Sequence, residues 1–165
     1  MIIIIKNKDT LLIDDFKLRC SVGKKGFNRK KIEGDFTTPK GTFKLGNIYY
    51  RPDKVRKPVS KLKLIPIRRN MGWCDDPKSK SYNKLIKIKK NLKIGYEELY
   101  RKDSKYDYLI LIEYNYKNTI RFKGSAIFIH LTKNYSPTKG CIALKKKDFL
   151  ILTKLINKKT KIKIN

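Results

Sequence analysis

Residues 125–144 read SAIFIHLTKNYSPTKGCIAL, and this stretch indicates both the fold class and the chemistry of the chain. Side chains alternate over residues 125–130, with Ile127 and Ile129 on one face, which is typical of a β-strand. Residues 131–139 are rich in Asn, Ser, Thr and Pro and predict a loop. The alternation resumes in the last four residues, where a second strand is expected. Strand, loop and returning strand are expected to bring the two ends of the stretch to one end of a sheet.

The same stretch carries the single histidine of the chain, His130, eleven residues before Cys141. A thiol is mostly protonated at neutral pH and attacks carbonyl carbon poorly until a base removes its proton. An imidazole, with an unperturbed pKa of about 6.5, is the usual base for that task. Gly140 precedes the cysteine and permits a close backbone approach or a positive φ. The alternative is structural, namely a buried, inert cysteine and a histidine that only satisfies hydrogen bonds.

The chain is strongly basic, with a net charge of +28 and a pI near 10.1. This balance is typical of nucleic-acid-binding proteins, so a basic nucleic-acid-binding module is one alternative. Two details weigh against specific nucleic-acid recognition. The chain has 34 lysines but only 8 arginines, the better bidentate partner, and its lysines are scattered from Lys6 to Lys163. A positive surface also attracts other polyanions, including polymers of the cell envelope.

Length and cysteine count limit the class further. A chain of 165 residues predicts one domain over residues 1–165. The chain has an odd number of cysteines without Cys-x-x-Cys spacing, namely Cys20, Cys74 and Cys141. Neither a disulfide framework nor a zinc site is therefore predicted. Residues 1–6 form too short an apolar run for a signal peptide or a membrane span. Export by another route, a missing leader and a cytoplasmic location all stay open.

Strand-like runs recur along the chain, separated by turn signals rich in Gly, Pro and Asp. Helices are expected only at 95–102, where two glutamates lie in the first turn, and at 148–157, an apolar segment typical of a buried helix. Many short strands with two small helices predict a mainly antiparallel sandwich or barrel-like domain. The expected strands are 1–6, 11–22, 42–51, 61–67, 84–88, 108–114, 126–130, 141–144 and 159–164.

Residues 129–144 resemble the signature of the L,D-transpeptidase catalytic domain (YkuD) family, in which a His is followed, after a loop, by Ser/Thr-x-Gly-Cys. The variant Pro-Thr-x-Gly-Cys-Ile-Ala-Leu is similar to that of one bacterial subgroup. The motif-bearing part covers about residues 10–157, and a series of motifs in the same order is hard to obtain by chance. The other matching segments are Glu33–Phe43, Arg51–Asp53, Gly72–Pro77 with Tyr82–Asn83, Tyr100–Asp103 with Tyr106–Asp107, and Gly124–His130.

The resemblance implies a single-domain, mainly β, YkuD-like β-sandwich with a few short helices. It also implies that Cys141 is the nucleophile that attacks the carbonyl between an L-centre and a D-centre of a peptidoglycan stem peptide. His130 then accepts the thiol proton and passes it to the leaving amine. The backbone carbonyl of Leu131 orients the histidine, and N–H groups around Gly140 hold the oxyanion. The resemblance implies no metal and no organic cofactor.

Two positions depart from the commoner family pattern. Lys139 stands where that pattern has a second His, and Ala143 stands where it has an Arg. The positive charge that binds a stem carboxylate is therefore expected elsewhere, and the candidates are Arg51, Arg101 and Lys139. The alternative for each of them is a solvated surface group. The remaining candidates for substrate binding are Ser125 and Thr138, and also Trp73, whose alternative place is the core.

The expected activity is that of a peptidoglycan L,D-transpeptidase, which passes the acyl group to an acceptor amine and forms a cross-link. The alternative on the same fold is an L,D-carboxypeptidase or endopeptidase that trims stems. The expected partners are stem peptides and carbapenem-type inhibitors, and no specific nucleic acid is expected. The chain is expected to be a monomer without a membrane span. The substrate favours the cell envelope or periplasm. Pairing with His130 predicts a low apparent pKa for the Cys141 thiol, which should rise when the histidine is replaced. The alternative is that neighbouring lysines stabilise the thiolate without the histidine; these are Lys133, Lys139 and Lys145–Lys147.

Overall fold

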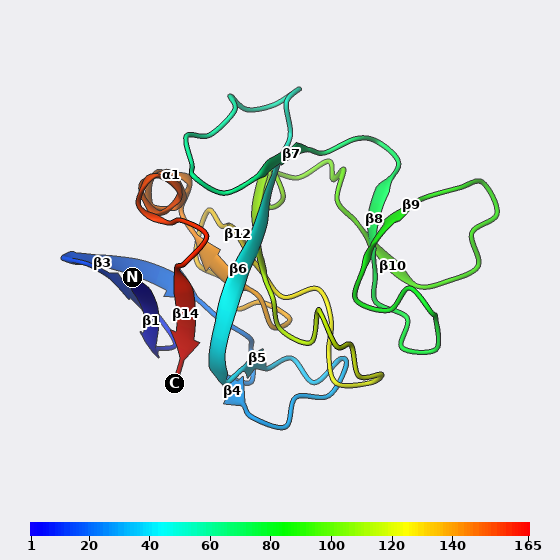
Figure 1. Ribbon diagram of the computed structural model, residues 1–165, viewed down its shortest axis with the longest axis horizontal. Helices are drawn as coiled ribbons and strands as arrows, with labels where there is room; N and C mark the ends of the chain where they lie inside the picture. The colour runs from blue at the N-terminus through cyan, green and yellow to red at the C-terminus, as the bar shows by residue number, and fades with distance from the viewer.

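The computed structural model describes all residues, 1–165, and is mainly β with one short helix (Figure 1). Its elements are β1 (Ile2–Asn7), β2 (Thr10–Ile13), β3 (Phe16–Ser21), β4 (Phe27–Asn28), β5 (Thr38–Pro39), β6 (Gly41–Tyr50), β7 (Leu64–Pro66), β8 (Met71–Cys74), β9 (Leu85–Lys87), β10 (Tyr96–Glu98), β11 (Tyr108–Ile112), β12 (Phe128–Leu131), β13 (Ile142–Leu144), α1 (Lys146–Leu155) and β14 (Lys161–Ile164).

Nine strands form one mixed sheet in the order β11-β12-β13-β3-β2-β1-β14-β6-β7. The sheet closes on itself because β11 also pairs with β6, with Leu109 opposite Tyr49. Three of the pairs are parallel, namely β1–β14, β6–β7 and β12–β13. A separate three-stranded antiparallel sheet, β10-β8-β9, lies beside the large sheet, at the right of Figure 1.

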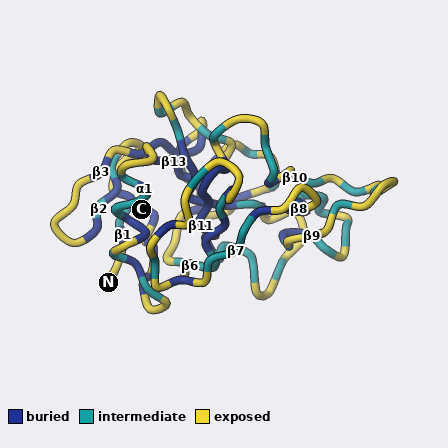
Figure 2. The backbone as a smooth tube through the Cα atoms, turned by 90° about the horizontal axis from the view of Figure 1, so that it is seen from above, coloured by how far each residue is buried: buried dark blue, intermediate teal, exposed yellow.

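Two hydrophobic cores stabilise this arrangement. The larger one contains 23 buried residues and includes Phe149 and Leu152 of α1, which pack against strands of the large sheet. The smaller one contains nine buried residues and joins the large sheet to Trp73 of β8 and to Leu99, which follows β10. Figure 2 shows the buried backbone along β11 and β13, between exposed loops at both ends of the molecule.

Strands β12 and β13 contribute to both cores because successive side chains of a strand point to opposite faces. Ile129 and Ile142 are paired in register and belong to the larger core. Phe128 and Cys141 belong to the smaller core. The alternation predicted for residues 125–144 is therefore confirmed, and it places the cysteine on the face that the three-stranded sheet covers.

The structure confirms the mainly β class and most of the expected strands. The expected strand 11–22 is instead a hairpin of β2 and β3, broken where Asp14 has a φ of 45°. The helix expected at 95–102 is wrong, since this segment contains strand β10, which pairs with β8. A helix of this length is unstable alone, so tertiary pairing decides the conformation. The helix expected at 148–157 is confirmed as α1, and it is the one helix of the chain.

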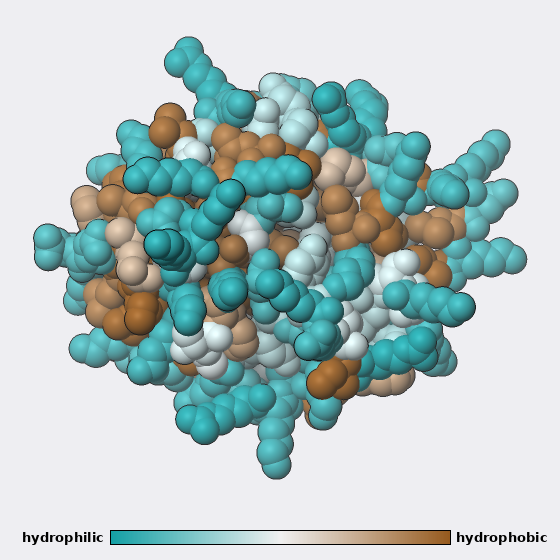
Figure 3. Space-filling view, viewed as in Figure 1, coloured by the Kyte–Doolittle hydropathy of each residue, from teal (hydrophilic) through white to brown (hydrophobic).

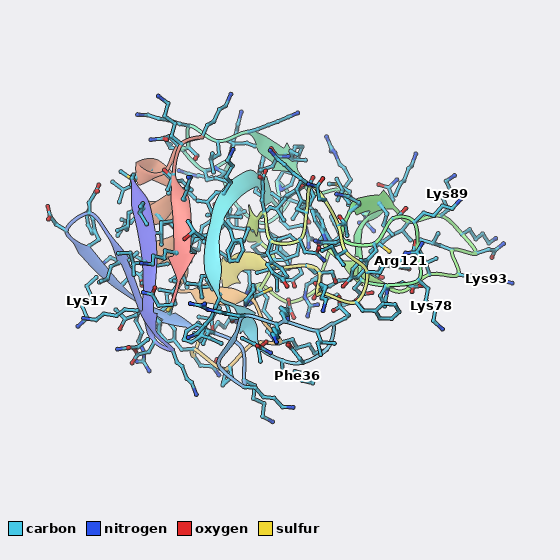
Figure 4. The ribbon with its side chains drawn as sticks, turned by 60° about the horizontal axis from the view of Figure 1, so that its bottom comes forward. Lys17, Phe36, Lys78, Lys89, Lys93 and Arg121 are labelled. Atoms are coloured by element: carbon cyan, nitrogen blue, oxygen red, sulfur yellow. The ribbon has the colours of Figure 1, made fainter.

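Basic side chains extend outward around much of the surface. In Figure 4, Lys17 lies at one end of the molecule, whereas Lys78, Lys89 and Lys93 surround the three-stranded sheet at the other. Figure 3 shows hydrophilic side chains spread over the visible face rather than gathered into one block. The one helix lacks the length and the apolar character that crossing a bilayer requires.

Candidate active site

The pairing of β12 with β13 brings the histidine and the cysteine together. The two strands are parallel, and His130 is the partner of Ala143 in their register. Cys141 precedes Ala143 by two residues, so its side chain points to the same face as the imidazole. Both side chains line one cleft with a volume of about 1010 Å³. The strand–loop–strand predicted from the sequence therefore places the two groups in one accessible space.

The Cys141 thiol is held by two backbone groups. Its Sγ donates a hydrogen bond to the carbonyl of Ala126 at 3.2 Å and accepts one from the N–H of Phe128 at 3.4 Å. Burial raises the pKa of this thiol to about 12 and the charge of Glu97 adds to the rise, whereas the Phe128 N–H and the Lys31 ammonium oppose it. The low apparent pKa expected for Cys141 is therefore wrong for this structure, because burial outweighs the groups that favour the thiolate.

The His130 imidazole has a defined tautomer. Its Nδ1 lies 2.9 Å from the carbonyl oxygen of Leu131, and a carbonyl only accepts, so Nδ1 carries the proton and Nε2 keeps a free lone pair. Burial lowers the pKa of His130 to about 4; the Leu131 bond opposes this, whereas the positive charges of Lys105 and Arg101 add to it. The site at neutral pH thus holds a neutral imidazole beside a neutral thiol.

A buried tyrosine packs near the imidazole and is hydrogen-bonded to a half-buried glutamate. The ring centroids of Tyr106 and His130 are 5.5 Å apart, and the Tyr106 hydroxyl donates to Glu97 Oε1 at 2.7 Å. Burial raises the pKa of Glu97, although this hydrogen bond and the charge of Arg101 oppose the shift. Sequence analysis missed the role of Glu97, because it placed this residue in the first turn of a helix.

The loop before Cys141 is fixed by hydroxyl groups. Gly140 has a φ of 147°, and a Cβ there would lie 2.8 Å from the carbonyl oxygen of Thr37, so the predicted need for glycine is confirmed. Thr38 Oγ1 donates to the Gly140 carbonyl at 2.8 Å, and Thr138 Oγ1 donates to the Cys141 carbonyl at 2.6 Å. The Gly140 N–H donates to Thr138 Oγ1 at 3.1 Å. That the Gly140 N–H holds an oxyanion stays a prediction.

Trp73 does not contact the cleft, which corrects its expected place among the substrate-binding residues. The side chain is fully buried, and its ring lies edge-on to Phe128 with the centroids 5.1 Å apart. Its Nε1–H donates to Asn83 Oδ1 at 2.9 Å, and the same oxygen accepts the N–H of Ala126 at 3.0 Å. Trp73 and Asn83 therefore support, from the core, the backbone that holds the thiol.

Arg51 is also outside the cleft, and its guanidinium is already paired. It donates to both carboxylate oxygens of Asp53, at 2.8 and 2.7 Å, and to the carbonyl of Arg101, and it stacks on the Tyr100 ring at 3.5 Å. This corrects its candidacy for gripping a stem carboxylate. Arg101 does line the cleft, where its guanidinium contacts Asp103 at 2.6 Å and is one-third exposed.

The other three candidates for substrate binding line the cleft as expected. Ser125 Oγ donates to Glu33 Oε2 at 2.7 Å, and the Thr138 hydroxyl is engaged with the Cys141 carbonyl. Lys139 is exposed. Their contacts with a substrate stay predictions. The lysine is the one charged residue of the three.

The cleft carries charges of both signs. Four of the 14 acidic residues of this basic chain line it, and they face several lysines and an arginine. Such a lining suits a peptide that carries both carboxylates and amines. No group of three or more His, Cys, Asp or Glu side chains is arranged to hold a metal ion. The four acidic residues are Glu33, Asp75, Glu97 and Asp103.

Comparisons with known proteins found a family match and a similar fold. The sequence model of the L,D-transpeptidase catalytic domain family, YkuD, matches residues 1–164. Among solved structures, the chain is similar to the crystal structure of the helical cell shape determining protein Pgp2 from Campylobacter jejuni, with a TM-score of 0.51 and 18% identity, which is a likeness of fold. The match covers 99% of this chain and 46% of that chain, so this chain spans about half the length of that protein. A comparison with curated proteins gave no match.

Proposed function

Because the chain belongs to the L,D-transpeptidase catalytic domain (YkuD) family, we propose that it transfers acyl groups of peptidoglycan stem peptides through Cys141 and thereby forms cross-links. One observation carries the assignment of the residues. The thiol of Cys141, which immediately precedes β13, and the imidazole of His130 in β12 line the same cleft, and the imidazole has the tautomer that a base needs. The proposed place of action is the cell envelope, where this polymer lies, and a role in cell shape would follow from it.

The first chemical step forms a thioester. The proton of Cys141 passes to Nε2 of His130 while Sγ attacks the carbonyl carbon between the L-centre and the D-centre. The resulting imidazolium donates that proton to the leaving amine when the carbon–nitrogen bond breaks. The Leu131 carbonyl holds Nδ1–H throughout at 2.9 Å and stabilises the imidazolium as it forms. The imidazole is neutral again once the terminal D-residue has left.

The second step decides between transpeptidase and carboxypeptidase. An amine of a neighbouring stem attacks the thioester carbon and loses a proton to His130, the carbon–sulfur bond breaks, and the imidazolium returns the proton to Sγ of Cys141. The product is a peptide cross-link, whereas water in place of the amine gives a shortened stem. Two of the carboxyl groups that line the cleft, those of Glu97 and Asp75, support the amine as acceptor because carboxylates attract an ammonium group. The trimming activity is the second candidate, and the product distinguishes the two.

Incubation with defined muropeptides is expected to trap the acyl-enzyme. A tripeptide, tetrapeptide or pentapeptide stem should add its acyl mass to Cys141, because a two-step acyl transfer must pass through that covalent species. Intact-mass spectrometry with peptide mapping measures the adduct. A carbapenem should acylate the same thiol. Dimer formed on adding an acceptor stem supports the transpeptidase, and shortened monomer alone supports the carboxypeptidase. The assignment to peptidoglycan fails if neither muropeptide nor carbapenem adds mass while iodoacetamide still labels Cys141.

The pH dependence of acylation should reflect the low pKa of His130. The neutral imidazole is the base, and burial lowers its pKa to about 4, so protonation should remove activity only well below the ordinary histidine range. We expect the rate constant of carbapenem acylation to keep its plateau at pH 6 and to fall as the pH approaches about 4. Stopped-flow measurements over this range, with circular dichroism at each pH, provide the test. An acid limb centred at or above about 6.5 would assign the titration to another group.

A further inference from the structure

Lys31 is a buried lysine whose ammonium lies at the candidate active site. The residue is 3% exposed, yet it lines the same cleft as Cys141. A lysine is rarely buried unless its charge is paired, and here Nζ lies 2.7 Å from Asp35 Oδ1. Asp35 is itself fixed, because it accepts the backbone N–H groups of Ile32 and Thr37 at 3.0 and 2.9 Å. The ion pair is therefore held by the loop before β5.

Two glycines make room for this side chain. A Cβ built at Gly124 would lie 2.8 Å from Cε of Lys31 and close to two further carbons of its aliphatic chain. A Cβ built at Gly140 would lie 3.4 Å from its Nζ. Both glycines have positive φ values, 97° and 147°. The lysine thus runs past one glycine and ends at the glycine that immediately precedes Cys141.

We propose that Lys31 is a positioning residue that stabilises the negative charge developing on Cys141 when its proton leaves. This rests on the proposed function, in which that cysteine is the nucleophile. Lys31 supplies a buried cation from a distant segment of the chain, on the Gly140 side of the thiol.

The charges around the thiol favour such a group. Burial and the charge of Glu97 both oppose ionisation of Cys141, and His130 is neutral before its proton transfer. Lys31 is the one ionisable side chain whose charge lowers the pKa of Cys141. Although burial opposes ionisation of Asp35, the hydrogen bonds from Lys31 and from the backbone lower its pKa to about 2. The ion pair is therefore intact across the neutral range, with the ammonium at the Gly140 end.

Alkylation of Cys141 by iodoacetamide tests the proposal, because this uncharged reagent reacts with the thiolate and needs no peptidoglycan. Lys31→Met removes the cation and should slow alkylation at pH 8 by about threefold to tenfold. The variant should have a higher thiol pKa and so a smaller thiolate fraction, and this loss outweighs the greater nucleophilicity of the more basic thiolate. Asp35→Asn removes the counter-ion and should speed alkylation by a similar factor. Lys31→Arg should keep the wild-type rate within about twofold, because it keeps the charge.

Lys30→Met is the matched control, because it removes the adjacent but exposed lysine and should leave the rate unchanged. Peptide mass spectrometry separates the Cys141 adduct from adducts at the other cysteines, and thermal melting reports folding. A purely structural role for the ion pair would change the Lys31→Met and Asp35→Asn rates in the same direction, and that result overturns the proposal. If Lys31→Met fails to fold, the Asp35→Asn variant decides by itself. An alkylation rate for this variant that is equal to or below the wild-type rate overturns the proposal. Failure of the muropeptide trap with a normal alkylation pattern would instead reject only the peptidoglycan assignment.

Discussion

Cys141→Ala should lose all measurable turnover of muropeptides, a fall of at least about 10⁴-fold in kcat, while circular dichroism and thermal melting stay close to wild type. Cys141 is the one cysteine that lines the cleft. Without its sulfur there is no atom to hold the acyl group, so both steps of the reaction are lost. The cavity left by replacing a thiol with a methyl group is small, so the fold should survive. Liquid chromatography of the muropeptide products, combined with mass spectrometry, measures the turnover.

The other two cysteines are natural controls. Cys20 belongs to the larger core, and burial raises its pKa to about 12, with the charge of Asp9 adding to the rise. Cys74 is fully buried, and its thiol lies 4.0 Å from the Asp76 carbonyl. Replacing either with Ala should cost about 1 kcal/mol of stability and leave activity intact. Full activity in Cys141→Ala, or an inactive but folded Cys74→Ala, would mean that the nucleophile has been wrongly assigned.

The sequence of residues 125–144 predicts its own structure well because the information there is local. Alternation with period two requires only neighbouring residues, and it correctly separates Ile129 from His130. The glycine before Cys141 is likewise predicted from its immediate context, and its φ of 147° confirms it. A strand, a loop of turn-forming residues and a second strand leave few ways to arrange the two reactive groups. This part of the candidate site therefore follows from the sequence.

The parts that sequence analysis missed depend on contacts between distant segments. Strand β10 forms because β8 offers it a partner, and nothing local to residues 95–102 indicates that pairing. Arg51 is an attractive candidate for binding a carboxylate until Asp53 and Tyr100 are seen to occupy its guanidinium. Lys31 is one of 34 lysines, and only the fold shows that it is buried beside Gly140. Composition cannot distinguish such a residue from its many solvated counterparts.

The electrostatics of the cleft have a mechanistic consequence. Burial raises the pKa of Cys141 and lowers that of His130, and both shifts favour the neutral forms. The reactive pair is therefore a thiol and an imidazole at rest, rather than a preformed thiolate–imidazolium pair. Charge separates only during attack, when the Leu131 carbonyl supports the imidazolium and the proposed cation at Lys31 supports the sulfur. A neutral thiol at rest also limits adventitious oxidation, because the thiolate is the reactive form.

Replacing the base tests this mechanism directly. His130→Gln should lower the acylation rate constant by about 10² to 10⁴, the usual contribution of a positioned general base, while the fold is retained because glutamine keeps a polar group of similar size. The residual rate should rise about tenfold per pH unit between pH 7 and 9, since hydroxide must then generate the thiolate of a thiol whose pKa burial raises to about 12. The wild type should stay flat over the same range, because its base is already neutral. Carbapenem acylation followed by intact-mass spectrometry gives both profiles. A His130→Gln enzyme with the wild-type rate and a flat profile would remove His130 from the role of base and leave the Cys141 thiolate to be generated by another group.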